Sequence, residues 1–433
     1  MKNFILLNIL ILFHPIVIFP QNSTHHLQLA WETEMNTGHG YPNSQYFDIL
    51  LDEDGAIYAT GNDFGAYGTT EAVIAKYDAD GNVLWQQFFK GAGSQQIGIA
   101  LRFDRVNQEL NVLVQDENSA VNSRAYHIVK FTTTGELVSA RRLALEEVEK
   151  HLIQQPFFDS AGNIYLLYGN RNSGTTQNGY LVKYANDGAV LWKNDYEDGN
   201  ETVGSSICAM DPGGNIVVAA MERSYTSYSS TVLLYKFNAD GEIIWQTQKE
   251  MSPNFANPNL RKITFDGESN ITVCWDNTSY NMPSINALSF DSTGEEMWGQ
   301  DFIIPDTDDL IELRDAYQTA DGELYMIGDI RPQGLQIVKY DNKGVLQWER
   351  FVMHEKWLNG WKISFIPVDN NQILVSGITN PGFGGSTAVT GAFVYTLKSD
   401  GQYEILFPDS YNFNFGLSVF NPILVTRAGD YFA

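Results

Sequence analysis

The sequence predicts an all-β fold, and specifically a β-propeller of four-stranded blades with a repeat of about 53 residues. Three observations lead to this prediction. One turn-centred motif recurs along the chain, a second motif alternates with it, and no segment shows a convincing helical pattern. Hydrophobic residues make up 43% of the 433 residues, which suffices for a large core. Short strands joined by tight turns account for the abundant glycine, tyrosine and phenylalanine.

The first motif is an aromatic strand, a glycine turn and a second strand that ends in tryptophan. Its copies are KYDADGNVLW (76–85), KYANDGAVLW (183–192), KFNADGEIIW (236–245), SFDSTGEEMW (289–298) and KYDNKGVLQW (339–348), with weaker copies KFTTTGELVS (130–139) and TLKSDGQYEI (396–405). Their last positions lie 50 to 57 residues apart, and one further step back from Trp85 reaches Trp31. We expect these tryptophans to pack between neighbouring blades, since one ligand site would not require a tryptophan in every repeat.

The second motif is a D-x-x-G or x-D-G turn between two apolar strands. Its copies are DEDGAIYATG (52–61), DSAGNIYLLYG (159–169), DPGGNIVVAA (211–220) and ADGELYMIG (320–328). Glycine permits the positive φ of a hairpin turn, and aspartate can bond back to the turn backbone. Two hairpins per repeat give the four strands of a propeller blade. The acidic turns could also suggest calcium, but they lack the spacing of an EF-hand loop, so we interpret them as turns.

The repeat count predicts an eight-bladed ring. Seven complete repeats lie between Trp31 and Ile405, and a further inner motif surrounds Gly429. We expect the two ends of the chain to share the last blade, which is incomplete because its third strand is missing, and we expect the gene to continue beyond it. A seven-bladed ring with spare end strands is the alternative. A stacked solenoid is a weaker alternative, since it predicts polar capping repeats at both ends.

Residues 1–20 form a basic start followed by an uncharged apolar run, the pattern of a secretory signal peptide. The run is short for a membrane span and contains Pro15 and Pro20. We therefore predict cleavage before Gln21, a single propeller domain over 21–433, and a secreted or cell-surface protein without membrane insertion after signal removal. An uncleaved N-terminal anchor is the alternative.

The consensus D-x-x-G-x-I-Y-x-x-G followed by K-Y-D-x-x-G-x-x-x-W resembles the bacterial SBBP-type propeller repeat and the quinoprotein-like (PQQ-like) blade. The resemblance covers about residues 27–433. It implies a propeller in an exported protein of the Bacteroidetes type, and it does not specify an activity. Quinoprotein dehydrogenases carry adjacent cysteines beside the cofactor, whereas Cys208 and Cys274 are far apart, so we expect no cofactor.

Composition and motifs exclude several classes of function. Lys and Arg total 27 against 52 Asp and Glu, a net charge of −25, which argues against a nucleic-acid partner. The seven histidines show no zinc-ligand spacing, and neither a G-x-S-x-G elbow nor a P-loop occurs. We expect no catalytic residue and no metal. Cys208 and Cys274 could form a disulfide or remain buried thiols, and the sequence leaves both open.

The longer connections between strands should gather on one face of the propeller, opposite the short glycine turns. Their aromatic and amide side chains resemble the mix that antibody paratopes use. The candidate ligand-binding residues are Trp357 and Trp361 in 354–362, Tyr225 and Tyr228 in 222–231, and Asn170 and Asn172 in 169–180. The alternative is that these loops only span the blades.

We accordingly predict a monomeric, non-catalytic scaffold that binds a glycan, a peptide or a partner protein. A polysaccharide hydrolase or lyase, or a cofactor-dependent oxidoreductase, is the enzymatic alternative. A rigid spacer within a larger surface protein is the structural alternative.

Overall fold

The structure is a computed structural model. It describes residues 16–21, 24–29, 45–52, 55–64, 70–118, 123–143, 151–170, 179–195, 202–223, 230–251, 258–278, 283–303, 310–330, 334–353, 360–369, 372–379, 391–407, 424–425 and 431–432. No helix occurs among these residues, and none of them therefore forms a helix that could cross a membrane. The all-β prediction is confirmed.

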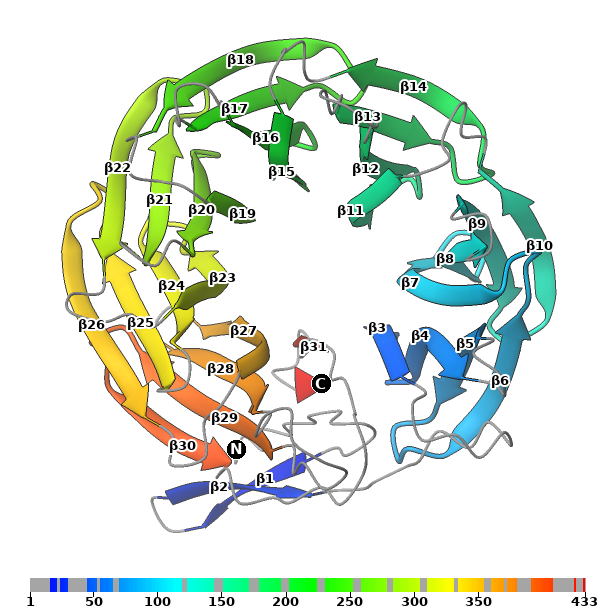
Figure 1. The fold of residues 1–433 in the computed structure, drawn as a ribbon. Helices are drawn as coiled ribbons and strands as arrows, with labels where there is room; N and C mark the ends of the chain where they lie inside the picture. Colours follow the sequence, from blue (N-terminus) through cyan, green and yellow to red (C-terminus); the bar gives the residue numbers. More distant parts are fainter. Residues whose placement is uncertain are drawn as a thin grey trace.

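The strands form four-stranded antiparallel units that follow one another around a ring (Figure 1). Blade 1 contains β3 (Gln45–Leu51), β4 (Ile57–Phe64), β5 (Thr70–Tyr77) and β6 (Val83–Phe89). Blade 2 contains β7 (Gln95–Asp104), β8 (Glu109–Asn118), β9 (Ser123–Thr132) and β10 (Leu137–Arg142). One parallel bridge, Thr70 to Gln95, joins these two blades into a single sheet.

The next five blades are separate sheets, each made of four consecutive strands. Blade 3 contains β11 (His151–Phe158), β12 (Ile164–Asn170), β13 (Gly179–Tyr184) and β14 (Val190–Asp195). Blade 4 contains β15 (Thr202–Met210), β16 (Ile216–Arg223), β17 (Ser230–Phe237) and β18 (Ile243–Glu250). Blade 5 contains β19 (Pro258–Phe265), β20 (Ile271–Asn277), β21 (Ser284–Phe290) and β22 (Glu296–Ile303). Blade 6 contains β23 (Ile311–Gln318), β24 (Leu324–Ile330), β25 (Gly334–Tyr340) and β26 (Leu346–Met353). Blade 7 contains β27 (Gly360–Asp369), β28 (Gln372–Thr379), β29 (Gly391–Lys398) and β30 (Tyr403–Phe407).

Four short strands complete the described chain. They are β1 (Ile16–Gln21), β2 (Thr24–Leu29), β31 (Leu424–Val425) and β32 (Tyr431–Phe432). β1 pairs with β2, and β31 pairs with β32. The β2 strand contacts β30 of blade 7, while β31 contacts the innermost strands of blade 7 and blade 1 (Figure 1).

The glycine turns are built as the sequence predicts. In the blade 4 inner hairpin, the amide of Gly214 donates to the carbonyl of Asp211, and Asp211 Oδ1 accepts from the amide of Asn215 at 2.8 Å. In blade 1, Asp78 Oδ1 likewise accepts from the amides of Asp80 and Asn82. These carboxylates are engaged within their own turns, which supports the turn interpretation over calcium binding.

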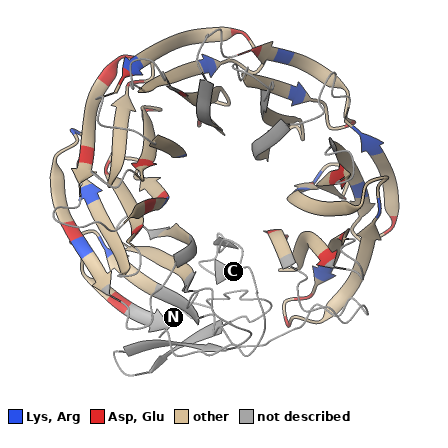
Figure 2. Ribbon diagram, in the orientation of Figure 1, with Lys and Arg blue, Asp and Glu red and all other residues tan. Residues whose placement is uncertain are grey.

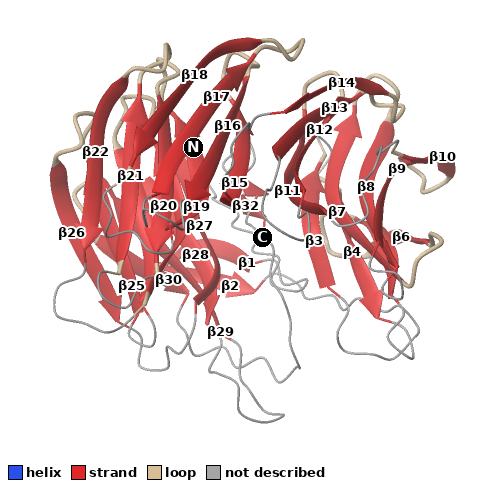
Figure 3. Cartoon of the chain, turned by 45° about the horizontal axis from the view of Figure 1, so that its top comes forward, coloured by secondary structure: helices blue, strands red, loops and turns tan. Residues whose placement is uncertain are grey.

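The two rims of the ring carry different connections between strands. In every blade the first strand pairs antiparallel with the second and the third with the fourth, so the connections within these two pairs lie on one rim (Figure 3). We call this the turn rim. The second strands end at the opposite rim, from which the connections to the third strands depart. We call that the long-loop rim.

Neighbouring blades are joined by their tryptophans, as predicted. Each described indole at the tryptophan position of the first motif donates its Nε1–H to a backbone carbonyl in the turn of the following blade. The five pairs are Trp85 to Thr133 (2.9 Å), Trp192 to Ala239 (3.1 Å), Trp245 to Ser292 (3.0 Å), Trp298 to Asn342 (3.1 Å) and Trp348 to Ser399 (2.9 Å). Gly241 shows why the turn needs glycine: its φ is +85°, and a Cβ there would lie 2.7 Å from Trp192. We call each such contact a tryptophan clasp.

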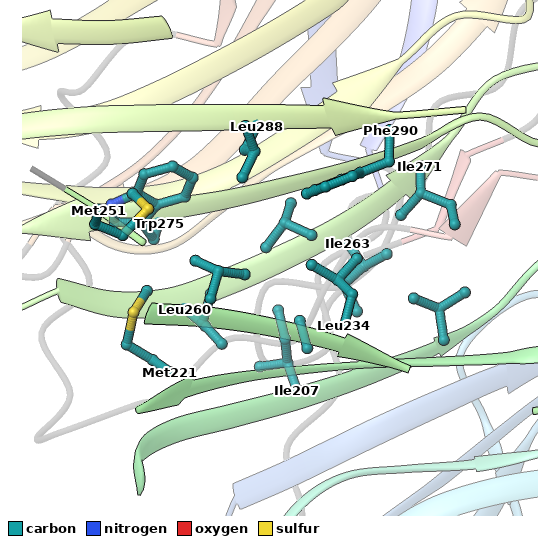
Figure 4. Close-up of a cluster of buried hydrophobic side chains, with 14 residues drawn as sticks. Ile207, Met221, Leu234, Met251, Leu260, Ile263, Ile271, Trp275, Leu288 and Phe290 are labelled. Atoms are coloured by element: carbon teal, nitrogen blue, oxygen red, sulfur yellow. The ribbon is translucent and has the colours of Figure 1, made fainter. Parts of the chain in front are cut away.

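Apolar side chains fill the space between blades. Between blades 4 and 5 a cluster gathers Ile207, Leu234, Ile263, Trp275 and Phe290 among its buried members (Figure 4). Trp275 is fully buried. Every described junction from blade 1 to blade 7 has an apolar cluster of this kind, so the core runs around the ring rather than lying at its centre.

The outermost strand of blades 1 to 6 carries a β-bulge just before the tryptophan position. In blade 4, Lys236 pairs with Trp245 while the next residue, Phe237, pairs with Ile243, so Ile244 is the extra residue. The same shift recurs in blades 1, 2, 3, 5 and 6. In blade 7 the extra residue is Leu406, directly after Ile405 at the tryptophan position. The apolar residues at the bulge are exposed, as with Ile243 and Ile244. A bulge interrupts the regular ladder at a sheet edge.

Candidate binding face

The structure places only part of the predicted ligand-binding set. Trp357, Tyr225, Tyr228 and Asn172 lie outside the described residues. Asn170 is the last residue of β12, at the long-loop rim, with its backbone paired to His151. The loop expected over 354–362 is shorter than predicted, because Trp361 belongs to β27 and pairs with Ile378.

The best-defined polar site on the long-loop rim is centred on Asp116 at the end of β8. Its carboxylate accepts hydrogen bonds from the amides of Ala92 and Gly93, both at 3.0 Å, and from Gln96 Nε2 at 2.7 Å. A Cβ on Gly93 would lie 2.5 Å from this carboxylate, so the segment between β6 and β7 closes tightly around it. Asp116 thus fixes the connection between blades 1 and 2 from within the sheet.

His127 on β9 lies beside the same carboxylate, with its Nε2 3.3 Å from Asp116 Oδ2 and its ring 5.3 Å from the Phe89 ring. Burial lowers the pKa of His127 below its usual value, and Asp116 only partly offsets this effect. The lowered pKa favours the neutral imidazole, and the pair acts as a packed polar contact.

A second polar site lies on blades 5 and 6, centred on Asp276 at the end of β20. Its fully buried carboxylate accepts from Arg261 Nε at 2.6 Å, from Asn259 Nδ2 at 3.1 Å and from the amide of Leu313 in blade 6 at 3.1 Å. Burial raises the pKa of Asp276 despite the Arg261 and Asn259 hydrogen bonds. This carboxylate ties the innermost strand of blade 6 to blade 5.

Blade 6 repeats the arrangement one blade further on. Arg314 donates to Asp329 at 2.8 Å and lies 2.9 Å from Glu312. Lys262 of blade 5 pairs with Asp315 of blade 6 at 2.8 Å, and Asp315 in turn accepts from the amide of Phe365 in blade 7 at 2.9 Å. The innermost strands of blades 5, 6 and 7 are thereby linked by charged side chains.

Two of these cations remain open to solvent on the innermost strand β19. The side chains of Arg261 and Lys262 are 36% and 43% exposed, although each is paired with a carboxylate. The β19 strand that carries them is the innermost strand of blade 5 (Figure 1). Figure 2 shows that charged residues of both signs are spread around the ring.

The cysteines are not paired. Cys208 and Cys274 are both free and buried, which selects the free-thiol alternative. Burial raises the pKa of the Cys208 thiol to about 12, and it raises that of Cys274 as well. Neither thiol is placed or ionised as a nucleophile would be.

The described side chains form no metal centre. Across the part of the chain that the structure describes, no three His, Cys, Asp or Glu side chains gather closely enough to hold a metal ion. The carboxylates of Asp116, Asp276, Asp315 and Asp329 all accept hydrogen bonds or ion pairs from neighbouring strands and loops. Their geometry is that of junction-forming groups.

Sequence reasoning did not single out Asp116, Asp276 or Asp329. Each lies within the last three positions of a second strand. The positions that correspond to Asp276 and Asp329 hold different residues in other blades, such as Gly169 and Met221. A search for polar residues at the ends of the second strands would have found them, but only once the strand register was known.

The paired strands and their order around a ring define the chain as an all-β protein on a propeller scaffold. No family model matches the sequence, and no curated protein matches it. Among solved structures, the chain is similar to the periplasmic gluconolactonase of Pseudomonas aeruginosa, with 14% identity, a TM-score of 0.48, and coverage of 81% of this chain and 95% of that one.

Two peptidases are also similar in structure. Prolyl oligopeptidase B from Galerina marginata has 14% identity and a TM-score of 0.47, covering 86% of this chain and 52% of that one. Acylaminoacyl peptidase from Pyrococcus horikoshii has 14% identity and a TM-score of 0.44, covering 86% and 53%. The chain thus spans about half the length of these peptidases. The propeller assignment rests on the strand pairing of the chain itself.

Proposed function

We propose that this protein is an exported, monomeric, non-catalytic propeller that binds a glycan, a peptide or a partner protein through its long-loop rim. One observation carries the proposal. The rim is rigidly built, because buried carboxylates such as Asp116 and Asp276 hold adjoining strands and connections by hydrogen bonds. Rigid positioning lowers the entropic cost of binding for the loops that leave this rim.

The ligand class follows from the side chains expected on those loops. Trp357, Tyr225 and Tyr228 supply flat apolar area, while Asn170 and Asn172 supply adaptable hydrogen bonds. A neutral glycan or a peptide suits this mixture better than a polyanion, since the chain carries a net charge of −25.

A glycan and peptide array with the purified mature chain tests this proposal. We expect specific, saturable binding without release of products, and we expect the double substitution W357A/Y225A to abolish it. A surface control, Lys249→Ala on β18, should leave binding unchanged. Turnover of a bound polysaccharide, or binding that survives the double substitution, would contradict the proposal.

Export is the second part of the proposal. It rests on the basic and apolar pattern of residues 1–20 and on the resemblance to secreted SBBP-type repeat proteins. Cleavage before Gln21 would remove all of β1 except its last residue. Mass spectrometry of the protein recovered from an expressing bacterial host should find Gln21 at the N-terminus, whereas retention of Met1 would argue for an uncleaved anchor.

The blade count belongs to the same proposal. We propose that the ring has eight blades, and that β31 and β32 supply inner strands and the N-terminal segment one outer strand of the eighth. The contacts of β31 with β27 and β3, and of β2 with β30, support this arrangement. Trp31 would then supply the clasp for the blade 1 turn that contains Gly81.

A further inference from the structure

One junction of the ring is built differently from its neighbours. From blade 1 to blade 7 the described chain contains six junctions, and five of them carry a tryptophan clasp. The exception is the junction between blades 2 and 3, where Ser139 occupies the tryptophan position. We call it junction 2–3.

The residues beside the missing clasp also change. In blades 1, 3 and 6 a tyrosine of the second strand packs edge-on against the tryptophan, as Tyr165 does against Trp192 at 5.9 Å. In blade 2 the corresponding second-strand residue is Asn111, which pairs with Arg102 on one side and Lys130 on the other. The row of side chains that faces blade 3 is therefore polar, whereas the same row in blade 3 is mainly aromatic.

Asn111 is poorly accommodated in this position. It is 0% exposed, and neither atom of its carboxamide has a hydrogen-bond partner within the protein. A buried amide without partners loses its hydrogen bonds to water and gains none in return. Opening of the junction would restore those bonds, so this residue favours an open state over the closed one.

Weaker contacts replace the clasp. The Arg102 guanidinium donates to the carbonyl of Ser160 in blade 3, and Arg141 lies 3.7 Å from Asp187 in an exposed ion pair. Leu143 folds back over Gly188, the turn residue that a tryptophan would otherwise cover. Exposed ion pairs contribute little and are screened by salt.

The other side of blade 2 is held far more firmly. Blade 1 reaches it through the Trp85 clasp and through Asp48, whose Oδ2 accepts from the amide of Leu101 at 2.7 Å. The parallel β-bridge between Thr70 and Gln95 joins the two blades into one sheet, whereas the other blades of the described chain are separate sheets. We therefore expect blades 1 and 2 to behave as one rigid unit.

We propose that junction 2–3 is the seam at which the ring opens, with blades 1 and 2 moving together as one body away from blade 3. The opening carries the Asp116 site with it, because that site lies wholly on blades 1 and 2. This inference does not depend on the identity of any ligand of the long-loop rim.

Hydrogen exchange of the whole chain measures the opening directly. The turn peptide around Gly188 in blade 3 should exchange about tenfold faster than the matching peptides around Gly241 and Gly294, a factor of the size expected from one unsatisfied buried amide. These peptides share the same turn and hydrogen-bond geometry. Equal protection in the three peptides would overturn the proposal.

The substitution Asn111→Leu tests the cause. Leu374 occupies the same position in blade 7, so the blade tolerates this side chain. We expect Asn111→Leu to slow exchange around Gly188 while leaving the Gly241 peptide unchanged. The control is Asn286→Leu. Asn286 is also buried but is hydrogen-bonded, so replacing it should lower the unfolding free energy of the chain. Faster or unchanged exchange around Gly188 in the Asn111→Leu variant would contradict the proposal that the ring opens at junction 2–3.

A matched pair of arginine substitutions gives an independent test that does not rely on Asn111. Arg102→Ala removes a cross-blade hydrogen bond at junction 2–3, while Arg350→Ala removes one at a junction that keeps the Trp348 clasp. We expect the first substitution to accelerate exchange across its junction severalfold and the second to change it little. The reverse order would contradict the proposal.

Discussion

At the scale of single residues, the ring is held by side chains that reach from one blade into the turn of the next. Lys183 and Trp192 of blade 3 both donate to the same carbonyl, that of Ala239 in blade 4. Lys339 and Trp348 do the same with Ser399 in blade 7. In blades 3 and 6 the lysine of the first motif is thus part of the junction, a role that the sequence pattern alone did not reveal.

Truncation of one clasp should be costly. Trp192→Ala removes a half-buried indole and its hydrogen bond to Ala239, and we expect a loss of about 3 kcal/mol in unfolding free energy. Denaturant unfolding would measure it. Trp192→Phe keeps the aromatic packing and should lose less than half as much. An alanine variant as stable as the wild type would show that the clasp does not contribute.

A buried ion pair provides the second prediction at this scale. Lys236 lies 2.9 Å from Asp211, with only 7% and 1% of their side chains exposed. Although burial alone would raise it, the pKa of Asp211 lies below its usual value because Lys236 and Asn215 donate hydrogen bonds to it. Lys236→Ala would leave the carboxylate buried without its cation.

We expect Lys236→Ala to lower the unfolding free energy by about 3–5 kcal/mol. Lys249→Ala is the matched control, since Lys249 forms a comparable pair with Glu296 that is exposed to solvent. That change should cost about 0–1 kcal/mol. Similar losses in both variants, measured by the same denaturant titration, would count against the role of burial.

At the scale of strands and blades, Asp48 couples β3 to β7 in a pH-dependent way. Its Oδ1 accepts from the amide of Ile49 and its Oδ2 from that of Leu101. Burial raises the pKa of Asp48 to about 6, although both hydrogen bonds act in the opposite direction. The folded chain therefore binds a proton that the unfolded chain releases between about pH 4 and pH 6.

This linkage fixes the sign of the pH dependence. Because the pKa is higher in the folded state, the contribution of Asp48 to stability increases as the pH falls from about 7 to 4.5, by about 2 kcal/mol. Asp48→Asn should remove that contribution from the pH profile of unfolding. A profile with the same slope in both proteins would assign the titration to other groups.

How far the sequence predicted these elements depends on the range of the interactions. The hairpins were predicted because Gly81, Gly241 and their counterparts define turns locally, and the clasps followed from the regular spacing of the tryptophans. The bulges before those tryptophans, the strand that contains Trp361 and the partners of Asp116 were not predicted. They depend on register and on contacts between blades, which local patterns do not encode.

At the scale of the whole molecule, closure of the ring remains a prediction. In the proposed eight-bladed ring Trp31 would be the clasp for the blade 1 turn. Trp31→Ala should then destabilise the chain by about as much as Trp192→Ala, on the order of 3 kcal/mol. Parallel thermal unfolding of the two variants would decide. A neutral Trp31→Ala would favour a seven-bladed ring with spare end strands.

The tryptophan clasp has a further consequence for how such a chain can be assembled. Blades 3, 4, 5 and 6 each carry both an indole that donates to the next blade and a glycine turn of the kind that accepts such a hydrogen bond, so any of these four repeats can follow any other. Duplication or loss of one of these repeats leaves the clasp chemistry of its neighbours intact. The number of blades in this architecture can therefore change by whole repeats without the invention of a new contact.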